Sequence, residues 1–134
     1  MKRSDRKAME ILKRGCLTRQ KLRFITITGV SDFRKQWRQL KSWLQTKMDL
    51  FEYFGVRTGE GTGVVHFVYE GKSVRWQELR DAWKEITGKS WIVHISAIKN
   101  MQAIIHELTR QSRKQRYFHS KHWLPPLSTQ IKFG

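Results

Sequence analysis

The stretch from Phe51 to Gly71 constrains the fold of this chain more than any other. Two runs rich in Val, Phe and Tyr flank a glycine-rich break at 59–63, and this pattern predicts a β-hairpin. Successive side chains of a strand point to opposite faces, and here both faces of both strands carry apolar residues. We therefore expect the hairpin at the centre of a sheet, with His66 in the middle of its second strand.

The segments on either side of the hairpin predict further strands and helices. Alternation and β-branched content predict strands over 22–28 and 91–98. Apolar residues at helical spacing predict helices over 33–46, 74–87 and 100–115. We expect Gly29 to end the first of these strands and Gly88 to end the second of these helices.

The resulting order of elements predicts an α+β fold. A ferredoxin-like or RRM-like βαββαβ core closes as an antiparallel sheet with helices on one face. The other face is left for a partner or a covering tail, and the apolar residues on both hairpin faces would also suit a homodimer contact. We divide the chain into a basic N-terminal arm or helix at 1–21, a single α+β domain at 22–126 and a C-terminal tail at 127–134.

Both ends of the chain are basic. Residues 4–14 predict a short helix that starts at a Ser4 cap and ends at Gly15. Two roles are open for this helix. It can pack a thin apolar stripe against the periphery of the core, or its basic residues can contact a phosphate backbone, and the two roles are compatible. The tail 116–134 has no clear period, and Pro125 and Pro126 within it stop regular structure, so we expect it to be irregular.

The charge balance indicates the class of partner. The chain has 27 Lys and Arg against 11 Asp and Glu, a formal net charge of +16, which predicts a polyanionic partner such as nucleic acid. An anionic membrane is less suited, because the basic residues are spread over several elements and not gathered on one amphipathic helix. We expect no membrane partner, no export signal and a cytoplasmic location, either nucleoid-associated or in a host cell.

The predicted nucleic-acid-binding residues precede or begin the first strand and follow the last helix. Basic residues of the second group alternate with aromatic ones, which suits phosphate contact with base stacking, each stacked base contributing roughly 1–3 kcal/mol. Alternatively, the aromatic residues pin the tail to the core while the charges are solvated. The candidate residues are Arg19, Lys21, Arg23, Arg110, Arg113, Lys114, Arg116, Tyr117 and Lys121.

No motif for metal, nucleotide or nucleophilic chemistry is complete. The five histidines form no HxxxH pair within a predicted helix and no HxH pair within a predicted strand. The GEGTG run joins two antiparallel strands and does not open a phosphate-binding helix. Cys16 is alone, which excludes an internal disulfide, and nothing marks a partner base for it. We expect no catalytic residue, no metal site and no cofactor, and interpret His66 as a packed residue.

The order of the motifs resembles the HUH-endonuclease family, the replication initiators of rolling-circle plasmids and viruses. FITITG resembles the first-strand motif of that family. YFGVRTGEG followed by GVVHFVYEG resembles the strand and glycine-rich turn that lead into its histidine–apolar–histidine motif. The similarity covers roughly 22–126 and implies an initiator-like fold with DNA as partner. For a complete member it also implies a divalent cation and a nucleophilic tyrosine.

The chain departs from that family where the chemistry is expected. Val64 stands where the family has the first of two metal-binding histidines, so His66 would be the one imidazole left. The helix that carries the nucleophilic tyrosine in the family has none here, and Tyr117 follows that helix. Nicking needs both the cation and the phenolate. The resemblance is therefore to a degenerate initiator that lacks both.

We expect a non-enzymatic DNA-binding protein that regulates transcription or replication for a virus or plasmid and binds duplex or single-stranded DNA. One alternative is a divergent active nickase that uses His66 and Tyr117, with Glu52 or Glu60 as a further metal ligand. Another is an RNA-binding RRM-like module, because RNA-recognition motifs share the βαββαβ order.

Overall fold

The computed structural model of the protein describes residues 3–17, 19, 21–58, 63–98, 100–111 and 116–124. None of the helices within these ranges is both long enough and apolar enough to cross a membrane. The elements in chain order are α1 (Arg3–Leu17), β1 (Leu22–Val30), α2 (Phe33–Lys47), β2 (Glu52–Thr58), β3 (Gly63–Glu70), α3 (Trp76–Thr87), β4 (Val93–Ala97), α4 (Met101–Gln111) and β5 (Arg116–His119).

The β2–β3 hairpin lies in the middle of the sheet, as predicted. The strands follow the order β4-β1-β3-β2-β5, and every neighbouring pair is antiparallel. Tyr53 and Phe67 point to one face of the sheet, whereas Phe54 and Val68 point to the other. Both faces of the hairpin carry buried side chains, whereas several residues toward the strand ends, and His66, are half-buried.

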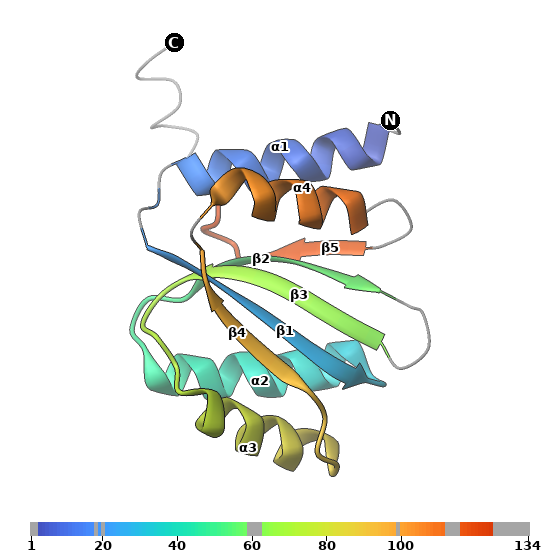
Figure 1. Cartoon of the computed structure of the whole chain (residues 1–134), viewed down its shortest axis with the longest axis vertical. Coiled ribbons are helices and arrows are strands. Elements are labelled where there is room, and N and C mark those ends of the chain that lie inside the picture. Colours follow the sequence, from blue (N-terminus) through green and yellow to red (C-terminus); the bar gives the residue numbers. More distant parts are fainter. Residues whose placement is uncertain are drawn as a thin grey trace.

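Helices cover both faces of this sheet. Figure 1 shows α2 and α3 together on one side and α1 and α4 together on the other, with the strands between them. The α+β fold with a ferredoxin-like antiparallel sheet is confirmed, and the two helices of its βαββαβ core share one face as predicted. The second face, which the sequence left to a partner or a tail, is covered in part by α1 and α4, while His94 and Ser96 of β4 on the same face stay exposed.

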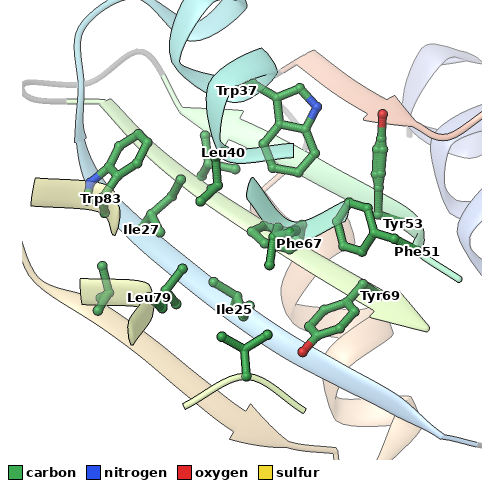
Figure 2. Packing of buried hydrophobic residues seen from close by; sticks show 14 of the residues in the cluster. Ile25, Ile27, Trp37, Leu40, Phe51, Tyr53, Phe67, Tyr69, Leu79 and Trp83 are labelled. Atoms are coloured by element: carbon green, nitrogen blue, oxygen red, sulfur yellow. The ribbon is translucent and has the colours of Figure 1, made fainter. Parts of the chain in front are cut away.

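The first core lies between the sheet and the α2–α3 layer. Trp37 of α2 stacks on Tyr53 with 4.9 Å between ring centroids and meets Phe67 edge-on at 5.0 Å (Figure 2). Trp83 of α3 is buried and donates its indole N–H to the carbonyl of Thr28 at 2.8 Å. Aromatic pairs of this kind add specific geometry to the burial of apolar area, and they fix both helices on the sheet.

The second core lies between the sheet and the α1–α4 layer. Leu12 of α1 and Ile105 of α4 are buried there against Phe54 and its neighbours. Trp123, which follows β5, is 0% exposed and donates its indole N–H to the carbonyl of Ile11 at 3.0 Å. A segment from the C-terminal part of the chain therefore helps to hold the N-terminal helix on the sheet.

Gly15 does not end the N-terminal helix, so that prediction is wrong. The helix α1 continues to Leu17, and Gly15 lies inside it beneath the ring of Trp123. A Cβ atom at this position would overlap the indole. Glycine is therefore required by the close approach of the two segments and not by a helix stop.

Gly29 does not end the first strand either. The strand β1 continues to Val30, and its pairing with β3 shifts between Ile27 and Val30, as in a β-bulge. Gly29 has φ +77°, and a Cβ there would overlap the ring of Trp91. Gly88, by contrast, ends α3 in the left-handed conformation with φ +81°, which confirms that prediction.

The strand β5 lies in the segment predicted to be irregular, so this prediction is also wrong. It pairs with β2 and sends alternate side chains into the two cores. Phe118 lies 4.8 Å from Trp37 in the first core, and Tyr117 stacks on Phe54 at 5.8 Å in the second. The strand has four residues, which is too short for its alternation to stand out in the sequence.

Replacing Gly15 with Ala should destabilise the protein by about 1–3 kcal/mol, because the new Cβ displaces the buried Trp123 ring. In a Trp123→Ala background, which itself costs about 3–5 kcal/mol, the same change should be neutral or stabilising because Ala favours a helix over Gly. Urea unfolding of the four variants measures this coupling. Equal destabilisation by Gly15→Ala in both backgrounds would contradict the contact.

Candidate nucleic-acid interface

The structure separates the predicted basic residues into two groups. Arg19, Lys21 and Arg23 lie at the end of the sheet where β1 begins, and the hydrogen bonds of Arg19 bring the 121–123 segment to the same end. Arg116 lies at the opposite end of β5, where it pairs with Arg57 of β2. The residues therefore do not form one continuous patch.

Arg19 is bound within the fold. Its side chain is 8% exposed, and its Nη atoms donate to the carbonyls of Gly15 at 2.8 Å, Trp123 at 2.7 Å and His122 at 3.0 Å. Its Nε lies 3.2 Å from a carboxylate oxygen of Glu70, and its guanidinium lies 4.4 Å from the centroid of the Trp123 ring. These contacts use the planar fork of an arginine to tie α1 to the C-terminal segment, so we remove Arg19 from the interface.

The other predicted residues at this end differ in exposure. Arg23 is half-buried and donates to the carbonyl of Gly71 at 2.7 Å, which also gives it a role within the fold. Lys21 and Lys121 are exposed, and they remain available to an anionic ligand. Two acidic residues, Glu52 and Glu70, pair across β2 and β3 at the same end and reduce its positive character.

The remaining predicted residues are only partly described. Arg113 and Lys114 lie outside the described residues, and for Arg110 and Arg116 the structure describes the backbone in α4 and β5 without the side chain. Tyr117 is half-buried and stacked on Phe54. Its ring therefore serves the second core.

The aromatic residues around Tyr117 do not form a stacking surface. Trp123 is 0% exposed. Phe118 lies against Trp37 and Tyr53, and its ring passes over Gly55, where a Cβ would overlap it. Between the two interpretations that the sequence left open, these contacts favour the one in which the aromatic residues pin the tail to the core.

The described basic residues that form a continuous row lie on α2. Arg34, Arg38 and Lys41 recur at helical spacing, so they share one flank of the helix, which we call the α2 flank. The other flank of α2 faces α3 across a groove that Gln39 and Trp43 help to line. The cations therefore point away from α3, toward the edge of the sheet formed by β5.

The α2 flank is electrostatically unfavourable for the isolated protein. The helix contains five basic residues, and its acidic residue is the N-cap, Asp32, whose carboxylate accepts from the N–H of Lys35. Arg34 and Lys35 stand in the first turn, where the helix dipole disfavours positive charge. Like charges three or four residues apart also repel, by about 0.2–0.5 kcal/mol per pair in isolated helices. Within the described residues, no carboxylate forms an ion pair with this row. The row therefore makes no evident contribution to stability.

Arg57 extends the basic surface onto the sheet. It lies over the ring of Phe33 at the start of α2, with 4.6 Å from its Cζ to the ring centroid. Its backbone partner across the β2–β5 pair is residue 116. Arg57 therefore places a guanidinium beside the N-terminal end of the α2 flank.

The acidic residues of the helical layer lie on the opposite side. Glu78, Asp81 and Glu85 of α3 line the groove between α3 and α2, together with Lys47 of α2. The α2–α3 layer is therefore polarised, with cations at its β5 side and carboxylates at its α3 side. Such a separation orients the protein in the field of a polyanion.

His66 is engaged with its neighbours on the α1–α4 face. Its Nδ1 lies 2.8 Å from the Thr26 hydroxyl, and its ring stacks on Phe24 with 5.9 Å between centroids. Thr26 also pairs with His94 of β4, so the two histidines flank one threonine in the same cross-strand row. Tyr117 lies in this row as well, separated from His66 by Val56.

The surroundings of His66 do not fit a divalent cation. Within the described part of the chain, no group of three or more His, Cys, Asp or Glu residues is arranged to hold a metal ion. Two residues that contact His66, Thr26 and Phe24, offer one hydroxyl oxygen and no carboxylate. Glu60 lies outside the described residues. We derive no reaction step through a metal.

Sequence reasoning missed the α2 flank although the signal is present. The range 33–46 contains Arg34, Lys35, Arg38 and Lys41 and no acidic residue, which is a local property of the sequence. A helix that has cations in its first turn and at i, i+4 and i+7, and an acidic residue at the N-cap alone, departs from the usual preference for acidic residues in the first turn. That departure identifies the surface without a structure.

Comparison with known proteins supports the fold only. No model of a known protein family matches the chain, and no curated protein matches it significantly in sequence. The fold is similar to that in the crystal structure of the hypothetical protein ORF119 from Sulfolobus islandicus rod-shaped virus 1, with a TM-score of 0.55. The two chains are 16% identical, and the match covers 81% of this chain and 93% of that chain. Identity at this level shows a shared fold and carries no function with it.

Cys16 is buried in the second core beside Arg19. Burial raises the pKa of its thiol from 9.0 to about 11, partly offset by the charge of Arg19. A thiol with a raised pKa is a weak nucleophile at neutral pH. Cys16 therefore serves packing, as the sequence suggested when no partner base could be found for it.

The raised thiol pKa predicts a loss of stability at alkaline pH. Because the folded pKa lies above the unfolded one, the contribution is complete below pH 9 and is lost as pH rises toward about 11. We expect the free energy of unfolding of the wild type to fall more steeply over this range than that of Cys16→Ala, by on the order of 2 kcal/mol. Urea titrations at several pH values measure both slopes, and parallel slopes would contradict the prediction.

Proposed function

We propose that the chain is a DNA-binding protein that acts without nicking, as a transcription or replication regulator of a virus or plasmid. The observation that carries the proposal is the α2 flank, a row of cations that repel one another at helical spacing and whose first member, Arg34, lies at the N-terminal end of the helix. A surface that makes no evident contribution to the stability of the free protein is explained if a polyanion neutralises it. The net charge of +16 points to the same class of partner.

The dimensions of the α2 flank suit a phosphate backbone. At 1.5 Å per residue, Arg34 to Lys41 spans about 10 Å along the helix axis. Four consecutive phosphates of one DNA strand, separated by three steps of about 3.4 Å along the helix axis, cover about the same length. Arg57 lies beside the start of this row over Phe33 and adds a further guanidinium, a group that binds phosphate well.

The α2 flank carries charge without exposed aromatic rings. Phe33, Trp37 and Phe118, the aromatic residues nearest to it, pack against one another in the first core. Single-strand binding without sequence preference usually combines a basic groove with aromatic side chains on which bases stack. The surface therefore favours contact with the DNA backbone, and duplex DNA is the form that we expect to bind at the α2 flank.

Reversing the three charges of the α2 flank, as Arg34→Glu, Arg38→Glu and Lys41→Glu together, should weaken duplex binding by at least about tenfold at low salt. The slope of log K against log salt should fall by about 3, one for each lost phosphate contact. Gel shifts across a salt series measure both quantities.

The matched control reverses three exposed lysines elsewhere, Lys72, Lys84 and Lys89, and so changes the net charge equally. It should weaken binding less and leave the slope nearly unchanged. Equal losses in both variants would place the binding elsewhere, and no binding of the wild type at low salt would reject DNA binding itself. Preferential binding to RNA of the same sequence would favour the RRM-like alternative.

A second candidate function, a divergent nickase, has one observation in its favour. His66 and Tyr117 occupy the same cross-strand row on one face of the sheet, with Val56 between them. Two strand spacings separate them by about 9.5 Å, so they do not touch but could flank one phosphodiester. In such a reaction the Tyr117 oxygen bonds to phosphorus and the 3′ oxygen of the broken strand leaves.

Incubation with labelled single-stranded DNA and Mn²⁺ distinguishes this candidate. Because Tyr117 is half-buried on Phe54, and because the described residues contain no group of three or more His, Cys, Asp or Glu arranged to hold a metal ion, we expect no covalent adduct. Tyr117→Phe is the control, since it removes the nucleophile and keeps the ring. An adduct that forms with the wild type and is lost in Tyr117→Phe would establish the nickase and overturn the proposal above.

A further inference from the structure

The two edges of the sheet differ in charge. The edge strand β5 begins with Arg116 and adjoins the α2 flank. The other edge strand, β4, lies within the run Ser90–Ile98, SWIVHISAI, which contains no Asp, Glu, Lys or Arg. Proteins commonly protect edge strands with charged side chains, proline or bulges, and β4 has none of these. Figure 1 shows β4 at the border of the sheet, beside β1.

The backbone of β4 presents hydrogen-bonding groups on its outer side. The carbonyl of Ile92 accepts from the N–H of Thr28, so Ile92 faces β1. Because orientation alternates along an antiparallel strand, His94 and Ser96 also face β1, whereas Val93, Ile95 and Ala97 face outward. In the described part of the chain, no hydrogen bond reaches the outward groups of Ile95 or Ala97.

Trp76 limits which part of this edge is open. Its indole N–H donates to the carbonyl of Val93 at 2.9 Å, which also confirms that this carbonyl faces outward. The indole is 49% exposed and is flanked by Arg80, whose Cζ lies 4.9 Å from the ring centroid. A strand added to β4 can therefore pair from Ile95 onward but meets the Trp76 side chain at Val93.

We propose that β4 pairs antiparallel with β4 of a second copy of this chain, about a two-fold axis beside Ser96. In this register Ile95 of each copy exchanges both of its backbone hydrogen bonds with Ala97 of the other. The Ser96 residues form the central pair that is not hydrogen-bonded, in which the two Cα atoms lie about 4.5 Å apart. The Trp76 side chains then stand at the two ends of the new ladder, where they fix its register.

The charge distribution favours this edge over the basic surfaces for contact between two copies. Each copy carries +16, so contact between copies is disfavoured wherever basic side chains face one another. The uncharged run at β4 avoids this opposition along the paired strands. The exposed Ile92, at 70%, and Trp76 supply apolar surface beside the edge. The sequence suggested a homodimer contact on the apolar faces of the β2–β3 hairpin, but helices of the same chain pack on those faces. The proposed pairing therefore places the homodimer contact at β4. It does not depend on DNA binding.

A cysteine at the two-fold axis tests the register. Under mild oxidation Ser96→Cys should form a covalent dimer, because the two sulfur atoms face each other across a close pair. His94→Cys is the matched control. It is an exposed position on the same strand and face, but in this register it opposes Ile98 of the second copy, so it should crosslink several-fold less. The native Cys16 is buried and does not compete.

Sedimentation of the wild type gives an independent measurement. Salt screens the repulsion between copies, so the dimer fraction should rise between about 0.1 M and about 1 M salt, opposite to the trend for DNA binding. Ser96→Lys, which opposes two charges across the axis, should abolish the dimer and leave the fold and DNA binding intact.

Three results would each overturn the proposal. They are a wild type that stays monomeric at high salt and high concentration, a dimer that survives Ser96→Lys, and crosslinking of His94→Cys equal to that of Ser96→Cys. A strand from a different protein as the natural occupant of this edge would give the first of these results.

Discussion

Phe54, Val56 and Val68 point to one side of the central hairpin, and Tyr53 and Phe67 point to the other, so water has to be excluded from both sides of the same two strands. A sheet with one apolar face needs a single helical layer, but this one needs two. The helices between the strands, α2 and α3, form one layer as the chain order dictates. The second layer has to be built from the segments outside the βαββαβ core, which are α1 before β1 and α4 after β4.

This requirement explains several features of the chain ends. The basic helix α1 is amphipathic and buries Ala8, Leu12 and Cys16, while its charged residues face outward. Gly15 leaves room for the Trp123 ring, and Arg19 binds the carbonyls of the segment that carries this ring. In the sequence Arg19 looks like part of a phosphate-binding cluster, but in the structure it holds α1 against the segment that carries Trp123. A cation can be neutralised inside a protein as well as by a ligand, and Arg19 is an example.

The sequence predicts the elements with local signals well and those without such signals poorly. The hairpin, its central position, and helices within a few residues of α2, α3 and α4 follow from period, glycine position and apolar spacing. Gly15 and Gly29 were misread because a glycine that admits an indole ring has the same local signature as one that ends an element. The strand β5 was missed because a strand this short is specified by its neighbour β2 and not by its own period.

The same distinction applies to the candidate site. Net charge and basic composition could be read directly, and they point to a polyanion. The sequence does not show which cations lack contacts within the fold, because those contacts join residues far apart in sequence. Examples are Arg19 with Trp123 and Arg23 with Gly71. The α2 flank lay within reach of sequence reasoning, since both its spacing and its lack of acidic residues are local properties.

The contact between Ile11 and Trp123 joins residues 112 positions apart. During synthesis the first core can form once β4 has emerged from the ribosome, but the second face of the sheet stays uncovered until Trp123 follows. Contacts of such long range slow folding, because the entropy of a large loop is lost before the contact is made. For that interval the nascent protein exposes a hydrophobic sheet beside a strongly basic surface. Transiently exposed hydrophobic surface of this kind favours aggregation, so the interval before Trp123 is in place is the vulnerable stage of folding.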